Sequence, residues 1–377
     1  MVDLSRPILP APLFACPDRQ TSAPFETRAA SGTESRLVAT ASALEEEGWW
    51  REKWSAPARQ LQVDATRKIL RSREACDSPF KQSLNPYRGC ELGCIYCCAR
   101  PAHALLGLSP TLDFETRIFH KPHAARLLRR ELGRPGYRYT STVLGSATDA
   151  YQPAERELLL TRGLLEVLYE LHHPVTVMTK SSLVLRDLEL LAIMARSGLV
   201  QVLISLSTLD GDLAKKMEPQ AATPQARLGA IRQISDAGIP VGVVLAPIIP
   251  GLTDQELENV LSAARQAGAH SARYSVLRLP CELLKSFDHW LLWNAPKHVA
   301  RVMAVLYGRY GCKAERLPAA NPIRGFKRYS HLLDERFKLA SAAFGFAELP
   351  ELNSRDFQAS PKVAPDDEAD HEQGRLF

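Results

Sequence analysis

The sequence predicts an α/β fold, a partial (β/α)6 barrel of the TIM type with an extension at each end. Between residues 80 and 277, apolar runs of strand length alternate with longer segments of helical periodicity, which is typical of parallel βα units. Six such units in about 200 residues are too few for a closed eight-stranded barrel and match an open one. The composition of the 377-residue chain, 45% hydrophobic and 24% charged, excludes collagen-like, wholly disordered and small disulfide-framework proteins.

The candidate strands are short apolar runs, and the segments between them carry apolar residues at helical spacing. Pro153 is expected to begin the first of four helices, whose apolar face includes Leu164 and Leu168. The three later helices are each followed by a glycine that is expected to end them. The predicted strands are 80–85, 139–144, 175–179, 200–206, 241–246 and 272–277; the later helices are 183–196, 224–237 and 254–267, followed by Gly198, Gly238 and Gly268.

The two ends of the chain differ from its middle in composition and charge. Residues 1–65 are expected to form a largely disordered leader, and residues 331–377 a C-terminal extension that ends in a flexible acidic tail. The core domain, residues 66–330, carries 35 Lys and Arg against 23 Asp and Glu, a formal charge of +12, whereas the leader carries −2 and the extension −5. A basic core fits an anionic partner such as nucleic acid or a phosphorylated cofactor, and equally a solvated surface.

The first ten residues lack the basic start and apolar run of a signal peptide, and no apolar stretch reaches the roughly 18 residues of a membrane span. We therefore expect a cytoplasmic protein without membrane association. In a reducing cytosol, clustered cysteines bind metal or carry redox chemistry rather than forming disulfides.

Three cysteines, Cys90, Cys94 and Cys97, have the spacing CxxxCxxC on a loop that follows the first candidate strand. Three thiolates on so short a loop can bind one face of a cubic iron-sulfur cluster and leave its fourth iron without a protein ligand. A cluster that reduces a bound molecule directly needs such an open iron. The alternative is a zinc knuckle in which His103 supplies the fourth ligand.

The cysteine spacing, with Tyr96 directly before the third cysteine, resembles that of the radical S-adenosylmethionine (SAM) superfamily. The neighbouring segments resemble in particular the branch related to spore photoproduct lyase, whose members are often labelled DNA repair photolyases. The resemblance covers about residues 78–293. It rests on Asn85-Pro86-Tyr87-Arg88-Gly89-Cys90, Arg100-Pro101-Ala102-His103, Asp113-Phe114-Glu115, Thr148-Asp149-Ala150-Tyr151-Gln152-Pro153, Thr179-Lys180-Ser181, Ala246-Pro247-Ile248-Ile249-Pro250-Gly251 and Leu277-Arg278-Leu279-Pro280.

The resemblance implies a lyase-like or modifying enzyme that cleaves S-adenosylmethionine reductively to methionine and a 5'-deoxyadenosyl radical. Cys90, Cys94 and Cys97 would hold a [4Fe-4S] cluster whose open iron chelates the amino and carboxylate groups of the cofactor. An electron donor such as flavodoxin or ferredoxin is implied. We expect the protein to be a monomer.

The groups of S-adenosylmethionine require polar and apolar partners at several strand ends. The superfamily usually has a Gly-Gly-Glu-like stretch after its second strand, so Thr148 or Asp149 would replace the absent glutamate as the acceptor for the amino group. A pairing with a structural acid is the alternative for Lys180, and a strand cap is the alternative for Ser205. The predicted cofactor residues are Tyr96 near adenine, Gly145, Thr148 and Asp149 after the second strand, Lys180 for the carboxylate, Ser205 and Ser207 for carboxylate or ribose, and an apolar wall at 243–247 for adenine.

Beyond these residues the sequence assigns no catalytic side chain. Cys98 is predicted not to ligate the cluster, since adjacent residues do not easily bind one cluster together. Cys98 and Cys281 are candidate hydrogen-atom donors, because spore photoproduct lyase is thought to use such a thiol, and small buried cysteines are the alternative reading of both.

Seven basic residues lie in and around one predicted helix between the cysteine loop and the second strand. Three of them, Arg126, Arg129 and Arg130, share a helical face that fits a phosphate backbone, or a solvated surface. We expect DNA or RNA as the substrate, with photoproduct repair or nucleotide modification as the reaction. The alternatives are a peptide or small-metabolite substrate, and a non-catalytic metal-binding protein that binds nucleic acid. The full set is Arg117, Lys121, Arg126, Arg129, Arg130, Arg134 and Arg138.

Overall fold

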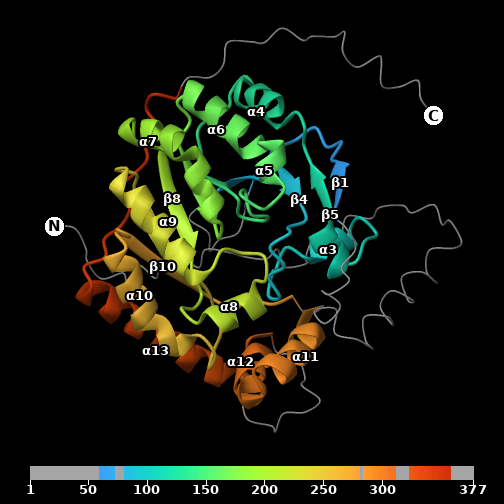
Figure 1. Ribbon diagram of the computed structural model, residues 1–377, viewed down its shortest axis with the longest axis vertical. Helices are drawn as coiled ribbons and strands as arrows, with labels where there is room; N and C mark the ends of the chain where they lie inside the picture. Colours follow the sequence, from blue (N-terminus) through green and yellow to red (C-terminus); the bar gives the residue numbers. More distant parts are fainter. Residues whose placement is uncertain (1–58, 73–79, 281–282, 311–321, 358–377) are drawn as a thin grey trace, which may run out of the picture.

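The computed structural model describes residues 59–72, 80–280, 283–310 and 322–357, and its central feature is a seven-stranded sheet (Figure 1). The strand order is β10-β9-β8-β7-β6-β3-β2; neighbours pair in parallel except β2, which is antiparallel to β3. The six predicted strands are its parallel strands, so the predicted α/β class is confirmed. The bounds are β2 (Leu70–Ser72), β3 (Gln82–Leu84), β6 (Thr142–Leu144), β7 (Val175–Thr179), β8 (Val200–Ser205), β9 (Val241–Ile248) and β10 (Ser271–Val276).

Successive side chains along the central strands enter two different cores. Val177 and Val202 belong to the larger core, which also contains apolar residues of the surrounding helices. Their neighbours Met178 and Leu203 belong to a smaller cluster with Val244. Parallel strands that are covered on both faces need apolar residues at consecutive positions. This is why β7, β8 and β9 appear in the sequence as continuous apolar runs.

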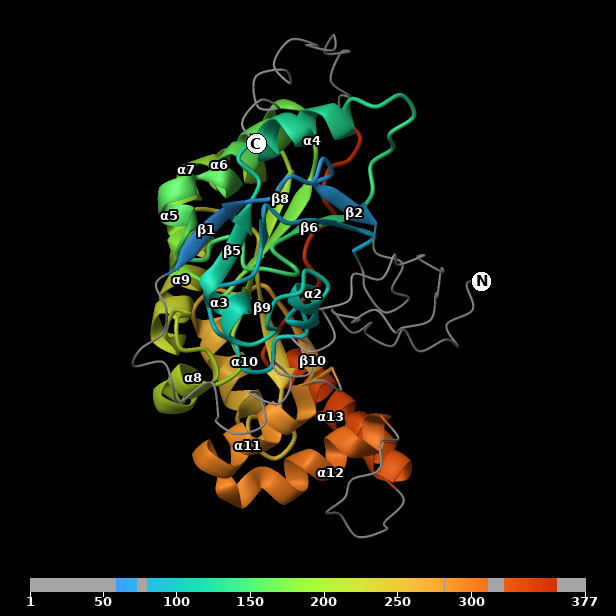
Figure 2. The ribbon, with the colours of Figure 1, turned by 90° about the vertical axis from the view of Figure 1, so that its right-hand side faces the viewer.

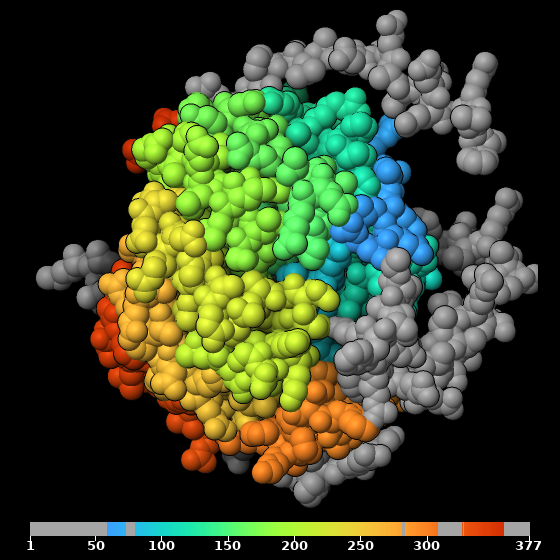
Figure 3. All heavy atoms as spheres, viewed as in Figure 1, coloured from blue at the N-terminus to red at the C-terminus, as the bar shows by residue number. Residues whose placement is uncertain are grey.

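Helices lie along the outer side of the sheet (Figure 1), and in the space-filling view of this face their side chains cover it (Figure 3). Three glycines that were predicted to end helices, Gly198, Gly238 and Gly268, have φ of 68°, 73° and 102° and lie just beyond helix ends. The helices are α4 (Ala124–Leu132), α6 (Leu160–Glu170), α7 (Leu188–Arg196), α9 (Pro224–Asp236) and α10 (Leu257–Gln266).

Three predicted helices are less regular than their apolar spacing suggests. The helix expected from Pro153 is divided into α5 (Glu155–Leu158) and α6 by Leu159, which has φ of 51°. The carboxylate of the buried Glu155 accepts a hydrogen bond from the backbone N–H of Thr161 (3.0 Å), which joins the two pieces across this break. The other two begin as short 3-10 helices, Ser182–Asp187 before α7 and Asp254–Glu256 before α10.

A second sheet of three short strands lies beside the first, with the order β1-β5-β4. Its first strand, β1 (Gln60–Val63), comes from the end of the predicted leader and pairs in parallel with β5 (Arg117–His120). The strand β4 (Tyr87–Arg88) pairs antiparallel with β5 and leads directly into the first cysteine. The short helices α2 (Pro101–Ala104) and α3 (Leu112–Thr116) lie between β4 and β5 in the chain.

Four further helices follow or flank the barrel: α8 (Gly211–Met217), α11 (Leu284–Asn294), α12 (Val299–Tyr310) and α13 (Pro322–Ala343). The predicted boundary between residues 330 and 331 falls inside α13. Leu333, Phe337 and Ala340, spaced at four and three residues along this helix, are buried in the larger core. The start of the predicted extension is therefore part of the packed molecule.

The residues after α13 return along the sheet, as Figure 2 shows in red. In this C-terminal segment (residues 346–357), the N–H groups of Ala347 and Asn353 donate to the carbonyl oxygens of His270 (2.9 Å) and Gly198 (2.8 Å). Both acceptors lie just before the amino ends of strands, β10 and β8. Leu349 packs against the smaller cluster. The segment therefore covers the amino edge of the parallel sheet.

Within the described ranges, no helix has the length and apolar composition needed to cross a membrane. The predicted leader up to residue 58 and the predicted acidic tail from residue 358 lie outside the described residues.

Candidate functional site

A cavity of about 140 Å³ opens at the carboxyl ends of the parallel strands, opposite the edge that the C-terminal segment covers. Its lining comes from the cysteine loop (residues 89–98) and from residues that follow or end β6, β7, β8, β9 and β10. Nine of the residues predicted to bind the cluster or the cofactor line this one cavity: Cys90, Cys94, Tyr96, Cys97, Gly145, Thr148, Asp149, Lys180 and Ser205. Ser207, which was predicted together with Ser205, is not among the lining residues.

The three motif cysteines carry thiols that are not in disulfides; Cys90 and Cys94 are buried and Cys97 is half-buried. Burial raises the pKa of Cys94 to about 12, and it also raises the pKa values of Cys90 and Cys97. The positive charge of Lys180 opposes this effect at Cys94 and Cys97. The loop thus holds three thiols against an apolar surround, with a cation facing two of them.

The chain enters the cysteine loop through Gly89, which has φ of 81°. A Cβ atom at this position would lie 2.9 Å from the carbonyl oxygen of Phe114, so only glycine allows the loop to pass here. Next to it, the N–H of Glu91 donates to the side chain of Gln152 (3.0 Å), and the carboxylate of Glu91 accepts from the N–H of Ala154 (2.6 Å). The residues after β6 therefore hold one side of the loop.

The other side of the loop is held by the last residue of α8 and by the residue that follows it. The N–H of Ile95 donates to the carbonyl of Met217 (3.0 Å), and the hydroxyl of Tyr96 donates to the carboxylate of Glu218. Glu218 is buried and forms an ion pair with the buried Arg227. Burial raises the pKa of Glu218, and the guanidinium of Arg227 acts in the opposite direction.

Arg227 also connects this support to the strand ends, because its Nη1 donates to the carbonyl of Ser205 (3.0 Å). Neither Glu218 nor Arg227 was predicted to belong to the site. A signal was present for Arg227, since it lies one helical turn before Ala230 and Ile231 on the buried face of α9. A charged residue on an otherwise apolar helix face indicates a buried polar partner.

Asp149 joins the ends of two strands. Its carboxylate accepts hydrogen bonds from the N–H of Tyr151 (2.8 Å), the hydroxyl of Thr179 (2.6 Å) and the N–H of Lys180 (2.7 Å). A carboxylate offers about four acceptor positions, so Asp149 keeps capacity for one further donor. Thr148, the other predicted acceptor, donates its hydroxyl to the carbonyl of Tyr87 (3.3 Å).

Gly145 begins the turn after β6 with φ of 88°. A Cβ atom here would lie 2.4 Å from the carbonyl oxygen of Met178, so this position requires glycine for packing between neighbouring strand ends.

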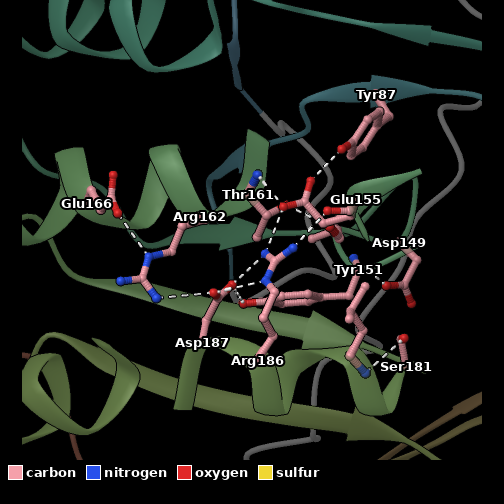
Figure 4. A network of polar contacts seen from close by, with 12 residues as sticks. Tyr87, Asp149, Tyr151, Glu155, Thr161, Arg162, Glu166, Ser181, Arg186 and Asp187 are labelled. Carbon is pink, nitrogen blue, oxygen red and sulfur yellow. Dashed lines mark hydrogen bonds and ion pairs between the residues drawn. The ribbon is translucent and has the colours of Figure 1, made fainter. Parts of the chain in front are cut away.

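A buried polar network lies directly behind Asp149 (Figure 4). Tyr151 donates its hydroxyl to Asp187 (3.0 Å), and Arg186 binds both Asp187 (2.7 Å) and Glu155 (2.9 Å). Glu155 also accepts from the hydroxyl of Tyr87, the residue that leads into the cysteine loop. The network fixes the turn that carries Asp149 against the start of the loop.

The side chain of Lys180 reaches over the ring of Tyr96, with Nζ 5.9 Å from the ring centroid. In the described part of the chain, no acidic side chain forms an ion pair with it, so the structural pairing considered for Lys180 is not observed there. Ser205 donates its hydroxyl to the carbonyl of Ala246 (3.0 Å), and Ser207 donates to Glu218 (3.4 Å). Ala246 and Pro247 of the predicted apolar wall line the cavity.

The zinc alternative does not fit the geometry. Among the described residues, no group of three or more His, Cys, Asp and Glu side chains is placed to hold a single metal ion. The Nε2 atom of His103 lies 3.2 Å from the carbonyl oxygen of Arg117, and its ring packs between Phe114 and Phe119. Cys98 lines the cavity beside Cys97, and Cys281 lies outside the described residues.

Fewer of the seven basic side chains are exposed than the sequence suggests. Lys121 is buried and pairs with Asp64, and Arg129 pairs with Glu170. Arg117 belongs to β5. The exposed members of the set are Arg126, Arg130, Arg134 and Arg138.

Comparison with known proteins gives a family match over the part of the chain that forms most of this site. The model of the radical SAM superfamily matches residues 84–264. An uncharacterized protein from Mycobacterium tuberculosis is 38% identical over 225 residues, which are 59% of this chain and 66% of that protein. One from Methanocaldococcus jannaschii is 29% identical over 217 residues, or 58% and 77% of the two chains. The chain thus spans 66% of the length of the mycobacterial relative.

Solved structures with a similar fold include two of spore photoproduct lyase. The lyase complexed with dinucleoside spore photoproduct has a TM-score of 0.53 at 14% identity, covering 84% of this chain and 93% of that chain. A mutant of the lyase has a TM-score of 0.50 at 14% identity, covering 76% and 80%. At this identity the likeness concerns the fold, and it confirms the predicted fold type.

Proposed function

We propose that Cys90, Cys94 and Cys97 hold a [4Fe-4S] cluster, because residues 84–264 match the model of the radical SAM superfamily, whose enzymes use such a cluster and S-adenosylmethionine. The single observation that carries this proposal is that the three thiols line one cavity together with Lys180 and Asp149. Three thiolates on one loop suit a cubane, since each binds a different iron and they need not converge on one ion. When bound, the reduced cluster supplies the electron that cleaves the sulfonium carbon–sulfur bond of S-adenosylmethionine.

The residues around the cavity suit the polar groups of this cofactor. The ammonium of Lys180 is available to bind the methionyl carboxylate, and a charge-assisted hydrogen bond of this kind is strong in a partly buried site. We assign the amino group to Asp149, whose carboxylate retains one acceptor position. The hydroxyl of Ser205 donates to Ala246 and keeps its lone pairs to accept from a ribose hydroxyl. Ala246 and Pro247 supply apolar surface for adenine and limit the access of water.

Two adjacent cysteines provide a matched test of the ligand assignment. Cys97 and Cys98 are both half-buried and both line the cavity. After anaerobic reconstitution, the wild-type protein and Cys98→Ala should hold about four iron and four sulfide per chain, whereas Cys97→Ala should lose most of the iron. The EPR spectrum of the reduced protein should change when S-adenosylmethionine is added. Zinc in place of iron, or equal iron in the two variants, would contradict the assignment.

We further propose that the substrate is a nucleic acid. The support is the exposed set Arg126, Arg130, Arg134 and Arg138 on and after α4, together with the +12 charge of residues 66–330. Spore photoproduct lyase, whose fold is similar, has been solved with a dinucleoside spore photoproduct.

The salt dependence of DNA binding tests this proposal. The double variant Arg126→Gln/Arg130→Gln should lower the slope of log affinity against log salt by about 0.9 for each phosphate contact that is lost. The matched control is Arg196→Gln/Arg232→Gln, which removes two exposed arginines from α7 and α9 and should leave the slope unchanged. Binding without salt dependence, or equal slopes in the two double variants, would count against nucleic acid and favour a peptide or metabolite substrate.

A further inference from the structure

The geometry points to Arg100 as a positioning residue that holds the middle of the cysteine loop and raises the reduction potential of the cluster bound there. This inference rests on the proposed function. Arg100 is the first residue of the Arg100-Pro101-Ala102-His103 segment, none of whose residues is assigned to the cluster or the cofactor. Its side chain is fully buried, with 0% exposure.

The guanidinium of Arg100 is bound on several sides by the backbone around the loop. Its Nε and Nη2 atoms both donate to the carbonyl oxygen of Cys94, at 3.0 and 2.8 Å. Its Nη1 atom donates to the carbonyl oxygens of Pro110 (3.3 Å) and Thr111 (3.1 Å). One side chain therefore ties the second motif cysteine to the segment that precedes α3. Only the planar five-donor fork of arginine can make these bonds together.

The charge of Arg100 is stabilised by α3. Its Nη2 atom forms an ion pair with Glu115, and its guanidinium carbon lies 5.2 Å from the ring centroid of Phe114. Burying a charge is costly unless it is paired and hydrogen-bonded, and a neutral donor could have held the Cys94 carbonyl at lower cost. A fixed cation bonded to a cysteine carbonyl favours the addition of negative charge to the nearby sulfurs and irons.

Reduction adds one electron, from the external reductant, to the cluster, and Arg100 exchanges neither an electron nor a proton. Its effect is electrostatic, so removing the cation should disfavour the reduced cluster. Removing the carboxylate of Glu115, which partly cancels the cation, should favour it. A residue that only held the loop in place would give no such opposite signs.

The test is a redox titration of the reconstituted full chain, monitored by EPR. In Arg100→Met, the ratio of reduced to oxidised cluster at a fixed potential should fall about tenfold, which is about 59 mV for a one-electron couple. In Glu115→Gln, the ratio should rise about threefold. Arg100→Lys keeps the charge without the fork, so its ratio should stay within about threefold of wild type while less iron is retained. Arg336→Met removes an exposed ion pair between α13 and Glu258, outside the cysteine loop, and should leave the ratio unchanged.

Unchanged ratios, or shifts of the same sign in Arg100→Met and Glu115→Gln, would overturn the inference. If Arg100→Met does not fold, Glu115→Gln decides: a rise supports the inference, and no change or a fall overturns it. Iron content separates this result from failure of the proposed function, because a wild-type chain that binds no cluster contradicts the proposed function itself.

Discussion

The two edges of the parallel sheet are covered in opposite ways. At the carboxyl edge, the cysteine loop and the strand ends leave a cavity lined by thiols, an ammonium and a carboxylate. At the amino edge, the C-terminal segment fills the corresponding space with its own side chains, among them Leu349 and Phe357. In barrels of parallel strands, chemistry belongs to the carboxyl ends and stability to the opposite face. In this protein the cavity lies at the carboxyl ends of the strands, and the packed C-terminal segment lies at the opposite face.

The two edges also differ in whether their polar side chains are fully hydrogen-bonded within the protein. At the amino edge, His173 is fully buried, and its Nε2 and Nδ1 atoms lie 2.9 Å from the hydroxyl of Tyr137 and 3.0 Å from the carbonyl of Pro174. At the carboxyl edge, Lys180 has its ammonium over an aromatic ring, and Asp149 has an acceptor position to spare. Changes at the first edge should therefore alter stability, and changes at the second edge should alter binding.

The largest expected effect comes from removing the C-terminal segment. A chain that ends after residue 345 loses Leu349, Phe346 and Phe357 and exposes the smaller cluster, so the free energy of unfolding should fall by about 4 kcal/mol. A chain that ends after residue 357 is the matched control, because it keeps Phe346, Leu349 and Phe357 and differs from the shorter chain only by residues 346–357. Urea denaturation of the two proteins measures the difference. Equal midpoints would mean that the segment does not close this edge.

A smaller loss of stability is expected when the pH of the solution is lowered, because of His173 at the same edge. Burial lowers the pKa of His173 from its usual 6.5 to about 4, so the unfolded chain takes up a proton between these values and the folded chain does not. The free energy of unfolding is therefore not reduced by this group above pH 6.5. It falls as the pH is lowered towards 4, by up to about 3 kcal/mol. His173→Gln should be less stable near pH 7 but should show a flatter decline. An equally steep decline in this variant would refute the assignment.

The smallest expected effect lies at the carboxyl edge and concerns binding. Lys180→Met should weaken the binding of S-adenosylmethionine to the reconstituted protein by about tenfold, because it removes the cation proposed for the carboxylate. The melting temperature should stay unchanged, since Lys180 forms no ion pair within the described residues. Lys215→Met, at an exposed position of α8, is the control. Isothermal titration calorimetry measures the affinity. An unchanged affinity in Lys180→Met would show that this residue does not bind the carboxylate of the cofactor.

Much of the carboxyl edge could be predicted from the sequence. Strand β7 has the predicted bounds, Val175–Thr179, because a strand buried on both faces is a continuous apolar run between turn residues. The positions of Asp149 and Lys180 follow directly, since both lie where a parallel strand has just ended. The CxxxCxxC spacing of the cysteines can be recognised in the sequence without knowledge of the fold.

The amino edge and the small sheet could not be predicted in this way. Strands β1, β4 and β5 have two to four residues each, too few to show alternation, and β1 pairs with residues 57 positions away. The C-terminal segment is held by backbone hydrogen bonds and by the side chains of Phe346, Leu349 and Phe357, whose spacing matches neither a helix nor a strand. Glu218 and Arg227 form a buried ion pair. The position of Arg227 on the apolar face of α9 indicates that it has a buried polar partner, but the sequence does not identify Glu218 as that partner.

The central claim is that the carboxyl edge cleaves S-adenosylmethionine. The most direct measurement is the amount of 5'-deoxyadenosine that anaerobically reconstituted protein forms from this cofactor after reduction with dithionite. Wild-type protein should form it, and Cys94→Ala should form none. A wild-type protein that holds its full complement of iron and still forms no 5'-deoxyadenosine, or a Cys94→Ala variant that forms as much as the wild type, would contradict the account.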